Sequence, residues 1–490
     1  MKKYLWLPLA LTFLFISCNK NDDGIGLPNG PNPNNVDATT QDFMWKSMNL
    51  WYFWQQDVAD LADNRFSSDE EYTEFLVSTP KPEDFFEQLR FEEDRFSWTV
   101  TNYTELTEFL GGVTKSNGLD FTLFTSSDSE SLFGVVNYIL PNSDASGKDI
   151  SRGEIFTAVN GNTLTLSNYE SLLFGDEDTY TLNMADVDGT SLMPNGKEVT
   201  LTKFENFQED PIFINKTFDI NGHKIGYLMY NRFLNEFDEQ LNAAFGQLKT
   251  AGITDFILDL RYNSGGSVNT ARLLSSMIYS TNTNTVFLRD RWNDKLQDIL
   301  GDTDYFASTT GDGSAINTLN LNKVYILTTR GTASASELVI NGLNPYIDVF
   351  LIGRTTRGKN EFSLTMVDDP QREGAPYLYT SSRENFINPD NSWAMQLLVG
   401  RTENSVGFID YTDGFAPMID QQEELGNYGD LGDESEPLLA TAIEEITGIS
   451  SRKALRTGPR ITLEYISNSK MFDPLKDNMI MDRTIDLKIQ

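Results

Sequence analysis

The stretch 323–359 constrains the fold of this chain more than any other part of it. A run of β-branched and aromatic residues at 323–329 predicts a short buried strand, which Gly331 ends. Apolar residues at helical spacing follow over 334–343, and a second strand is predicted at 347–352. A strand, a helix and a strand in immediate succession indicate a parallel or mixed sheet flanked by helices.

Ser334 lies where the first of these strands turns into the helix, and two interpretations of it are open. Ser334 and Glu337 have the S-x-x-E spacing of a capping box, which alone would explain both residues. Alternatively, a serine on a sharp strand-to-helix turn presents its hydroxyl to a cleft as a nucleophile. The first turn of the helix would then offer free N–H groups to a developing negative charge.

The same alternation of strand and helix extends over 205–445. Strands are predicted at 223–230 and 253–260, and amphipathic helices at 237–248 and 268–278. In sheets of this kind the functional site lies at the carboxyl ends of the strands. The loops that follow the strands are therefore the place to look for chemistry.

Two blocks of sequence resemble the C-terminal processing peptidases, also called tail-specific proteases, a family of serine peptidases with a Ser-Lys dyad. The family patterns are G-S-A-S-A-S-E followed by G-K, and L-D-L-R-x-N-x-G-G. The corresponding residues here are Gly331-Thr332-Ala333-Ser334-Ala335-Ser336-Glu337 with Gly358-Lys359, and Leu258-Asp259-Leu260-Arg261-Tyr262-Asn263-Ser264-Gly265-Gly266. Both blocks occur in the family's order, and Ser334 and Lys359 have the family's spacing.

The resemblance implies an α/β core of the crotonase-like (ClpP/crotonase) kind, with Ser334 as nucleophile and Lys359 as general base. Ser336 is the competing nucleophile and ranks second because it does not keep the spacing to Lys359. Glu337 is assigned to helix capping without a catalytic role. The family commonly has a glutamine four residues after the lysine, where this chain has Ser363, so Ser363 is the candidate for orienting the amine.

The resemblance also implies an oxyanion hole formed by backbone N–H groups. The N–H of Ala335 would act together with an N–H from Gly265 or Gly266. Glycine suits the second position because the backbone can approach the substrate without a side chain in the way.

Composition narrows the classes of partner and cofactor. The 490-residue chain has 72 acidic and 38 basic residues and a net charge of −34, which argues against nucleic acid and anionic lipid surfaces as partners. The chain has one cysteine and one histidine, which exclude an intrachain disulfide framework and a thiolate–imidazole zinc site. We expect no metal and no cofactor. The single histidine, His223, is predicted to be a solvated residue at a turn, which leaves no histidine for a Ser-His-Asp triad.

The first residues resemble a lipoprotein signal. Residues 1–17 have basic residues followed by a short apolar run, as in a signal peptide, and Cys18 falls where a lipobox requires the lipidated cysteine. A tether rich in Asn, Gly and Pro follows over 18–36, and 20–23 resembles the acidic surface-export signal of Bacteroidota lipoproteins. We expect a lipid anchor at Cys18 and a location in the cell envelope, on the outer membrane.

Two further domains precede the core. Residues 37–110 are predicted to form a helical domain with an aromatic core, and 111–204 a β module. The β module resembles a PDZ domain, in which Gly118, Leu119 and Phe121 would belong to the loop that binds a peptide carboxylate. Asp120 stands where such loops have a second glycine and places a negative charge at that position. The tail, 446–490, has no sequence-based assignment.

The leading hypothesis is a lipid-anchored serine endopeptidase acting on proteins or peptides. Two alternatives stay open at this stage. One is a surface lipoprotein of the same fold that binds peptides with little or no catalysis, and the other is a glycan-binding lipoprotein whose aromatic residues form platforms.

Overall fold

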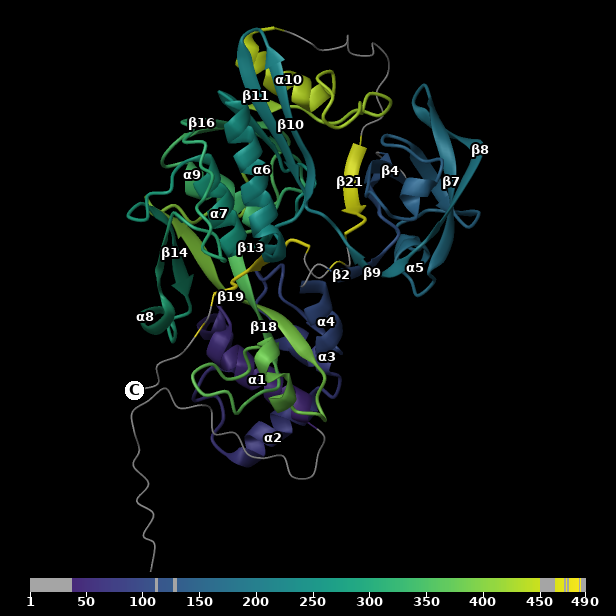
Figure 1. Ribbon diagram of the computed structural model, residues 1–490. Coiled ribbons are helices and arrows are strands. Elements are labelled where there is room, and N and C mark those ends of the chain that lie inside the picture. Colours follow the sequence, from purple (N-terminus) through teal and green to yellow (C-terminus); the bar gives the residue numbers. More distant parts are fainter. Residues whose placement is uncertain are drawn as a thin grey trace, which may run out of the picture.

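The computed structural model describes residues 38–110, 113–126, 130–449, 463–470, 473, 476–483 and 485. Figure 1 shows an α/β core, a β module beside it, and a group of helices beneath the core. The predicted signal peptide, Cys18 and the tether lie outside the described residues. Within the described part of the chain, no helix has the length and apolar character needed to cross a membrane.

The core is built on a six-stranded sheet in which all strands but the first run parallel. Its spatial order is β10 (Ile212–Ile220), β11 (His223–Tyr230), β12 (Asp255–Asp259), β16 (Lys323–Thr328), β17 (Asp348–Gly353) and β20 (Ile419–Asp420). The helices α6 (Asp238–Ala251), α7 (Val268–Ile278) and α9 (Ala335–Leu343) share one hydrophobic core with Leu258 and Ile326. The helix α10 (Pro437–Thr447) shares another with Ile257 and Tyr325. Neighbouring strand residues thus point to opposite covered faces, which explains the nearly continuous apolar runs in the sequence.

A second sheet crosses the lower part of the core. Its order is β13 (Gly266–Ser267), β22 (Met479–Ile480), β18 (Glu361–Val367), β19 (Ala394–Asn404), β14 (Val286–Trp292) and β15 (Thr303–Tyr305), and β1 (Trp98–Val100) pairs with β19. The short helix α8 (Gln297–Leu300) follows β14. The long hairpin of β18 and β19 extends from the core toward the N-terminal helices (Figure 1).

Four helices form the N-terminal part, as expected for 37–110. They are α1 (Thr39–Trp51), α2 (Asp69–Ser78), α3 (Pro82–Leu89) and α4 (Tyr103–Leu110). The prolyl residue Pro82 opens α3, with acidic residues in the first turn. The indoles of Trp45, Trp51 and Trp54 are buried, and Trp51 donates a hydrogen bond to the Pro376 carbonyl in the loop between β18 and β19. The helices therefore pack on the hairpin of the core.

The β module is a twisted sheet with one short helix, α5 (Tyr169–Leu173). Its order is β21 (Leu463–Asn468), β3 (Leu119–Ser126), β4 (Leu132–Ile139), β5 (Ile155–Val159), β7 (Thr179–Asp188) and β8 (Ser191–Thr202), with β6 (Asn162–Thr163) on β5. A two-stranded ladder of β2 (Val113–Ser116) and β9 (Phe204–Gln208) joins the module to the core. Short 3-10 helices occur at Gln55–Asp57, Ala59–Leu61, Ala145–Gly147, Asn235–Phe237 and Ser381–Phe386.

The tail, which has no sequence-based assignment, contributes one strand to the sheet of the module and one to the second sheet of the core. Its strand β21 pairs antiparallel with β3 at the edge of the module, and β22 lies between β13 and β18 in the core. The described residues of the tail therefore contact both the module and the part of the core where the two sequence blocks meet.

Candidate active site

Ser334 lies at the carboxyl edge of the parallel sheet, at the end of the turn from β16 into α9. Its backbone has φ 62° and ψ −116°, a conformation that costs energy for a residue with a side chain. The turn is held by Thr332, whose hydroxyl donates to Leu260 O at 2.9 Å, and by the Ala333 N–H, which donates to Asn263 O at 3.1 Å. The strain is thus imposed by bonds to the neighbouring loop that follows β12.

The hydroxyl of Ser334 is buried and has no hydrogen-bond partner among the described residues. Ser334 and Glu337 have the arrangement of a capping box, but the Ser334 hydroxyl does not come within hydrogen-bonding geometry of the N–H of the third helical residue. The other half of the capping box is present, since the Ser334 N–H donates to Glu337 Oε2 at 2.9 Å. The local cap is therefore supplied by Glu337 alone, and the Ser334 hydroxyl is left free for another use.

Glu337 does more than cap the helix. Its Oε2 also accepts the N–H of Lys359 at 2.9 Å, and its Oε1 accepts the N–H of Gly358 at 2.7 Å and the hydroxyl of Thr356 at 2.5 Å. One carboxylate oxygen is thus shared by the backbone nitrogens of Ser334 and Lys359. This brings the two residues together, although they lie on different elements. Burial raises the pKa of Glu337 to about 7, against the four hydrogen bonds that lower it.

Lys359 is 1% exposed, and its ammonium lies 4.8 Å from the centre of the Phe96 ring. Burial lowers the pKa of Lys359 to about 8, while the negative charges of Glu361, Asp477 and Asp94 raise it and Arg95 lowers it. Burial disfavours the ammonium form, so a sizeable fraction of this amine is neutral near physiological pH. Phe96 belongs to the N-terminal part of the chain, which thus supplies a wall of the lysine's pocket.

The glycines of the second block lie against Ser334. Gly265 and Gly266 have φ of 115° and 132°, a region that favours glycine. A Cβ on Gly265 would lie 2.7 Å from Ser334 Cβ and 2.6 Å from the carbonyl oxygen of Asn478. Only glycine allows the loop to come this close to the serine.

The N–H groups expected to form the oxyanion hole have different partners. The Ala335 N–H, at the first residue of α9, has no acceptor in the described part of the chain. The Gly265 N–H donates to its neighbour Asn263 Oδ1 at 2.9 Å, and the Gly266 N–H donates to the Asn478 carbonyl at 2.7 Å. Gly266, rather than Gly265, therefore offers its N–H to a peptide carbonyl beside Ser334.

Ser363 makes its hydrogen bonds away from the lysine amine. Its hydroxyl donates to Asn478 Oδ1, with Met479 O as a second, more distant acceptor at 3.3 Å, and accepts a hydrogen bond from Gln396 Nε2 at 2.8 Å. The bond to the Lys359 amine that sequence reasoning considered is not among them. The side chain lies in the second sheet, on β18, and faces the tail strand β22.

The loop at Gly118 has its amides satisfied from within. The Gly118 N–H donates to Ser116 Oγ and the Leu119 N–H to Asn117 Oδ1, both at 3.0 Å. The Phe121 ring lies in the core of the module. The main-chain groups of Phe121 bind Ser469 of the tail, since Phe121 O accepts the Ser469 N–H at 2.9 Å and the Phe121 N–H donates to Ser469 Oγ at 3.2 Å.

Several partners of the site were missed by sequence reasoning. Arg261 is fully buried and pairs with Asp259, Glu423 and Glu436, so it anchors the loop that carries the two glycines. The L-D-L-R pattern of the second block contains the first of these pairs and could have suggested it. Phe96 and Asn478 come from distant parts of the chain and have no local signal.

Other chemistry finds little support in the described ranges. No group of three His, Cys, Asp or Glu side chains could hold a metal ion there. His223 pairs with Asp255 at the amino end of β11, whereas Ser334 follows the carboxyl end of β16. Because these strands are parallel members of one sheet, the histidine and the serine lie at opposite edges.

The parallel sheet thus carries at its carboxyl edge a strained, buried serine whose backbone N–H shares the Glu337 carboxylate with that of a buried lysine. Residues 224–393 match the model of peptidase family S41, and residues 39–98 match that of the peptidase S41 N-terminal domain. These two matches confirm the family expected from the two sequence blocks.

Individual relatives are distant in sequence. Carboxyl-terminal-processing peptidase 3, chloroplastic, of Arabidopsis thaliana is 25% identical over 261 residues, which is 50% of this chain and 47% of the relative. The carboxy-terminal processing protease CtpB of Bacillus subtilis is 23% identical over 177 residues, which is 36% of this chain and 32% of the relative. The chain thus spans less than half the length of these curated relatives. A crystal structure from Bacteroides fragilis assigned to the S41 proteases is 28% identical, covers 83% of this chain and 97% of its own, and has a TM-score of 0.64. This likeness confirms the α/β fold.

Proposed function

We propose that this chain is a serine endopeptidase that hydrolyses peptide bonds of protein substrates through Ser334 and Lys359. The observation that carries the proposal is the shared carboxylate of Glu337, which holds the backbones of Ser334 and Lys359 at one point. The serine hydroxyl is buried without a partner, and the lysine has a lowered pKa. Neither feature benefits stability, and both are what a nucleophile and a base require.

The chemistry follows from these groups. Neutral Lys359 takes the proton of Ser334 Oγ as the oxygen attacks the peptide carbonyl carbon. The N–H groups of Ala335 and Gly266 stabilise the negative charge on the carbonyl oxygen. The lysine then returns the proton to the leaving amine, and a water molecule hydrolyses the acyl-enzyme with the lysine again as base. Among the described residues the one histidine lies at the far edge of the sheet, which supports lysine in this role.

The β module is proposed to receive the peptide before cleavage. Its strand β3 follows the Gly118 loop and is paired with β4 on one side and with the tail strand β21 on the other, so a peptide would pair with β3 in the place that β21 holds. Asp120 is buried in this groove, so the recognition of a free carboxylate there is disfavoured by its charge. Binding by main-chain pairing along β3 fits a protein segment better than a terminal carboxylate alone.

We further propose that Cys18 carries a lipid anchor that places the peptidase in the cell envelope, at the outer membrane. The support is its position after a short apolar run and before a Pro- and Asn-rich tether. Replacing Cys18 by alanine should release the protein from membranes or leave the precursor unprocessed. Membrane fractionation and processing identical to the wild type would contradict the anchor.

The catalytic proposal is tested with purified protein and three variants. Ser334→Ala and Lys359→Ala should each abolish hydrolysis of a quenched peptide and reaction with a fluorophosphonate serine label, with unchanged far-UV circular dichroism. Ser336→Ala is the matched control, because the Ser336 hydroxyl is already bonded to Asn263 O at 3.0 Å. Wild-type activity in Ser334→Ala would refute the assignment. Peptide binding without hydrolysis or labelling of the wild type would instead identify a peptide-binding protein of the same fold.

A further inference from the structure

The tail of the chain lies where a bound peptide would lie on the module. Strand β21 pairs antiparallel with β3 from Leu463 opposite Ser126 to Asn468 opposite Thr122. The pairing continues at Ser469, whose N–H donates to Phe121 O. The tail therefore runs toward the Gly118 loop, in the direction expected of a peptide whose C-terminal end lies near that loop. Asp120 Oδ2 accepts a hydrogen bond from Ser469 Oγ at 2.9 Å, which fixes the end of the strand.

Beyond the module the tail crosses to the core. Lys470 Nζ donates to the Tyr262 carbonyl at 3.1 Å, in the loop that leads to the two glycines. Further along, Asp477 forms an ion pair with Arg357 at 3.3 Å, two residues before Lys359. The tail thus contacts the loops that carry the oxyanion hole and the base.

The tail then enters the active site itself. The Asn478 carbonyl accepts the Gly266 N–H at 2.7 Å, and the Asn478 side chain binds Ser363 Oγ. Strand β22 continues between β13 and β18, and the Met481 N–H donates to Ser363 O at 3.2 Å. A peptide carbonyl of the chain itself therefore occupies an N–H group that would hold the oxyanion of a substrate.

We propose that the described tail residues, 463–470 and 476–483, are a built-in occupant of the substrate path, which closes the site to other peptides until the tail is displaced. This inference rests on the proposed peptidase function, since it names the regulation of that same site. Because the tail is part of the chain, it competes with free peptides for the site at an effective concentration of about the millimolar range. A free peptide must therefore bind tightly, or first displace a part of the tail that lies outside the site.

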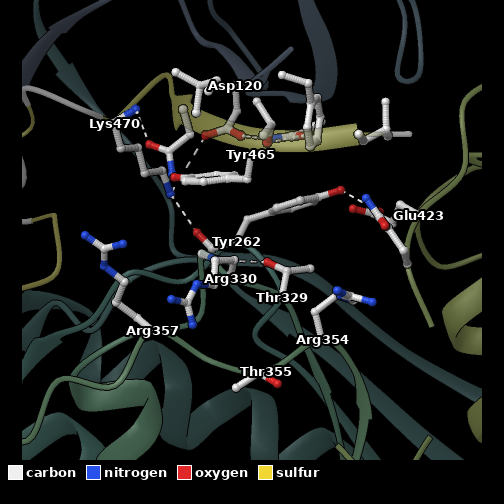
Figure 2. A pocket seen from close by; sticks show the side chains of 18 of the residues that line it. Asp120, Tyr262, Thr329, Arg330, Arg354, Thr355, Arg357, Glu423, Tyr465 and Lys470 are labelled. Carbon is white, nitrogen blue, oxygen red and sulfur yellow. Dashed lines mark hydrogen bonds and ion pairs between the residues drawn. The ribbon is translucent and has the colours of Figure 1, made fainter. Parts of the chain in front are cut away.

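One side of the tail is open enough for displacement to begin. A cavity of about 580 Å³ lies between the module and the core, and Tyr465 and Lys470 of the tail form part of its wall. Figure 2 shows Tyr465 on the tail strand facing Arg330, Arg354 and Arg357, which rise from the core loops on the opposite side. The cavity leaves one side of β21 open, whereas Leu463, Tyr465 and Ile466 pack against hydrophobic clusters of the module, so displacement has to break these contacts.

The other end of the tail is held more firmly. Asn478, Met479 and Met481 are 5% exposed or less, and the last two belong to the main hydrophobic core. Asp482 accepts hydrogen bonds from Ser267 Oγ and from the Asn269 N–H. Displacement is therefore expected to begin at β21, and the Asn478 carbonyl is expected to leave the site last.

The first test removes the tail and returns it as a separate peptide. Deletion of 463–490 should increase the rate of fluorophosphonate labelling of Ser334 at least tenfold. A synthetic peptide of residues 463–483 should suppress this gain, and the same peptide with the Asn478→Ala change should do so less well. Equal labelling rates for the full-length and the folded, truncated protein would overturn the proposal.

A second test keeps the chain intact, because deletion also removes buried core residues. The Cα partners Thr122 and Asn468 are both changed to cysteine in a Cys18→Ser background, so that a disulfide locks β21 on β3. The matched control joins Thr181 and Thr200, which are partners in the β7–β8 ladder of the same module. Oxidation should slow labelling at least threefold in the tail variant and leave the control unchanged, and reduction should reverse it. A locked tail that does not slow labelling would overturn the proposal.

Occupancy of the site by the tail can be tested separately from the peptidase activity. Fluorescence anisotropy of the labelled 463–483 peptide with the truncated Ser334→Ala protein measures occupancy without catalysis. Saturable binding that is reversed by an excess of unlabelled peptide supports the proposal that the tail occupies the site, even if the wild type hydrolyses no peptide. Absence of binding to this folded protein overturns the occupant, although hydrolysis and labelling by the wild type would still stand.

Discussion

Raising the pH from 7 to 9 should increase the rate of peptide hydrolysis about tenfold, because the proposed base is a lysine. Burial lowers the pKa of Lys359 to about 8, and only the neutral amine accepts the proton of Ser334. About one tenth of the amines are then neutral at pH 7 and about nine tenths at pH 9. Activity therefore rises as the pH passes through the pKa of the folded protein and levels off above it.

Two neighbouring carboxylates sharpen this expectation. The charge of Asp477 raises the pKa of Lys359, so Asp477→Asn should move the midpoint of the profile to lower pH. Glu337 has a pKa raised to about 7, and its protonation would disturb the four hydrogen bonds that it accepts. The profile should consequently be steeper below pH 7 than above it.

The measurement is kcat/KM for an internally quenched peptide from pH 6 to 10 at constant ionic strength, with circular dichroism at each pH. Lys359→Arg is the control, because a guanidinium stays protonated across this range and should leave no activity at any pH. The one histidine of the chain, His223, lies at the opposite edge of the sheet from Ser334. A flat profile between pH 7 and 9, or the same rise in Lys359→Ala, would refute the reasoning.

Three further substitutions test the geometry of the site. Gly265→Ala places a Cβ 2.7 Å from Ser334 Cβ, at a residue with a φ of 115°. It should reduce kcat at least about a hundredfold, and a near-normal kcat would contradict the close approach of the glycine loop to Ser334. Ser336→Ala removes one hydrogen bond and should cost about 1 kcal/mol of stability while kcat, measured on the quenched peptide, stays within about threefold. Glu337→Gln turns an amide N–H₂ toward backbone N–H donors, and should lower the free energy of unfolding by about 1–3 kcal/mol and also lower kcat. A purely capping role of Glu337 predicts lower thermal stability with kcat intact.

The parts of the site predicted from sequence are those with local signals. Ser334 lies on a strand-to-helix turn, and the glycines follow a strand, so both could be placed from short patterns. Glu337 was assigned to its helix cap because its bonds to Gly358 and Lys359 depend on how two crossover loops meet in space. A pattern of neighbouring residues in the sequence does not predict contacts between loops that are distant along the chain.

The tail shows the same limit on a larger scale. Strands of six and two residues with mixed composition carry weak signals, and β21 and β22 are stabilised by the edges on which they pair. Their partners, β3 in the module and β13 in the core, lie far away in the sequence. The parallel sheet, by contrast, was predicted because its strands are apolar on both faces and alternate with amphipathic helices.

The ring of Phe96 beneath the lysine has a consequence for how this protein can evolve or be engineered. The residue belongs to the segment matched by the N-terminal domain model, yet its ring lies 4.8 Å from the catalytic amine proposed for the core. An N-terminal domain without an equivalent ring would leave the Lys359 amine closer to water, and its pKa would return toward 10.5. The pKa of the proposed base therefore depends on residues of two domains. A substitution in one domain that changes this contact requires a compensating substitution in the other.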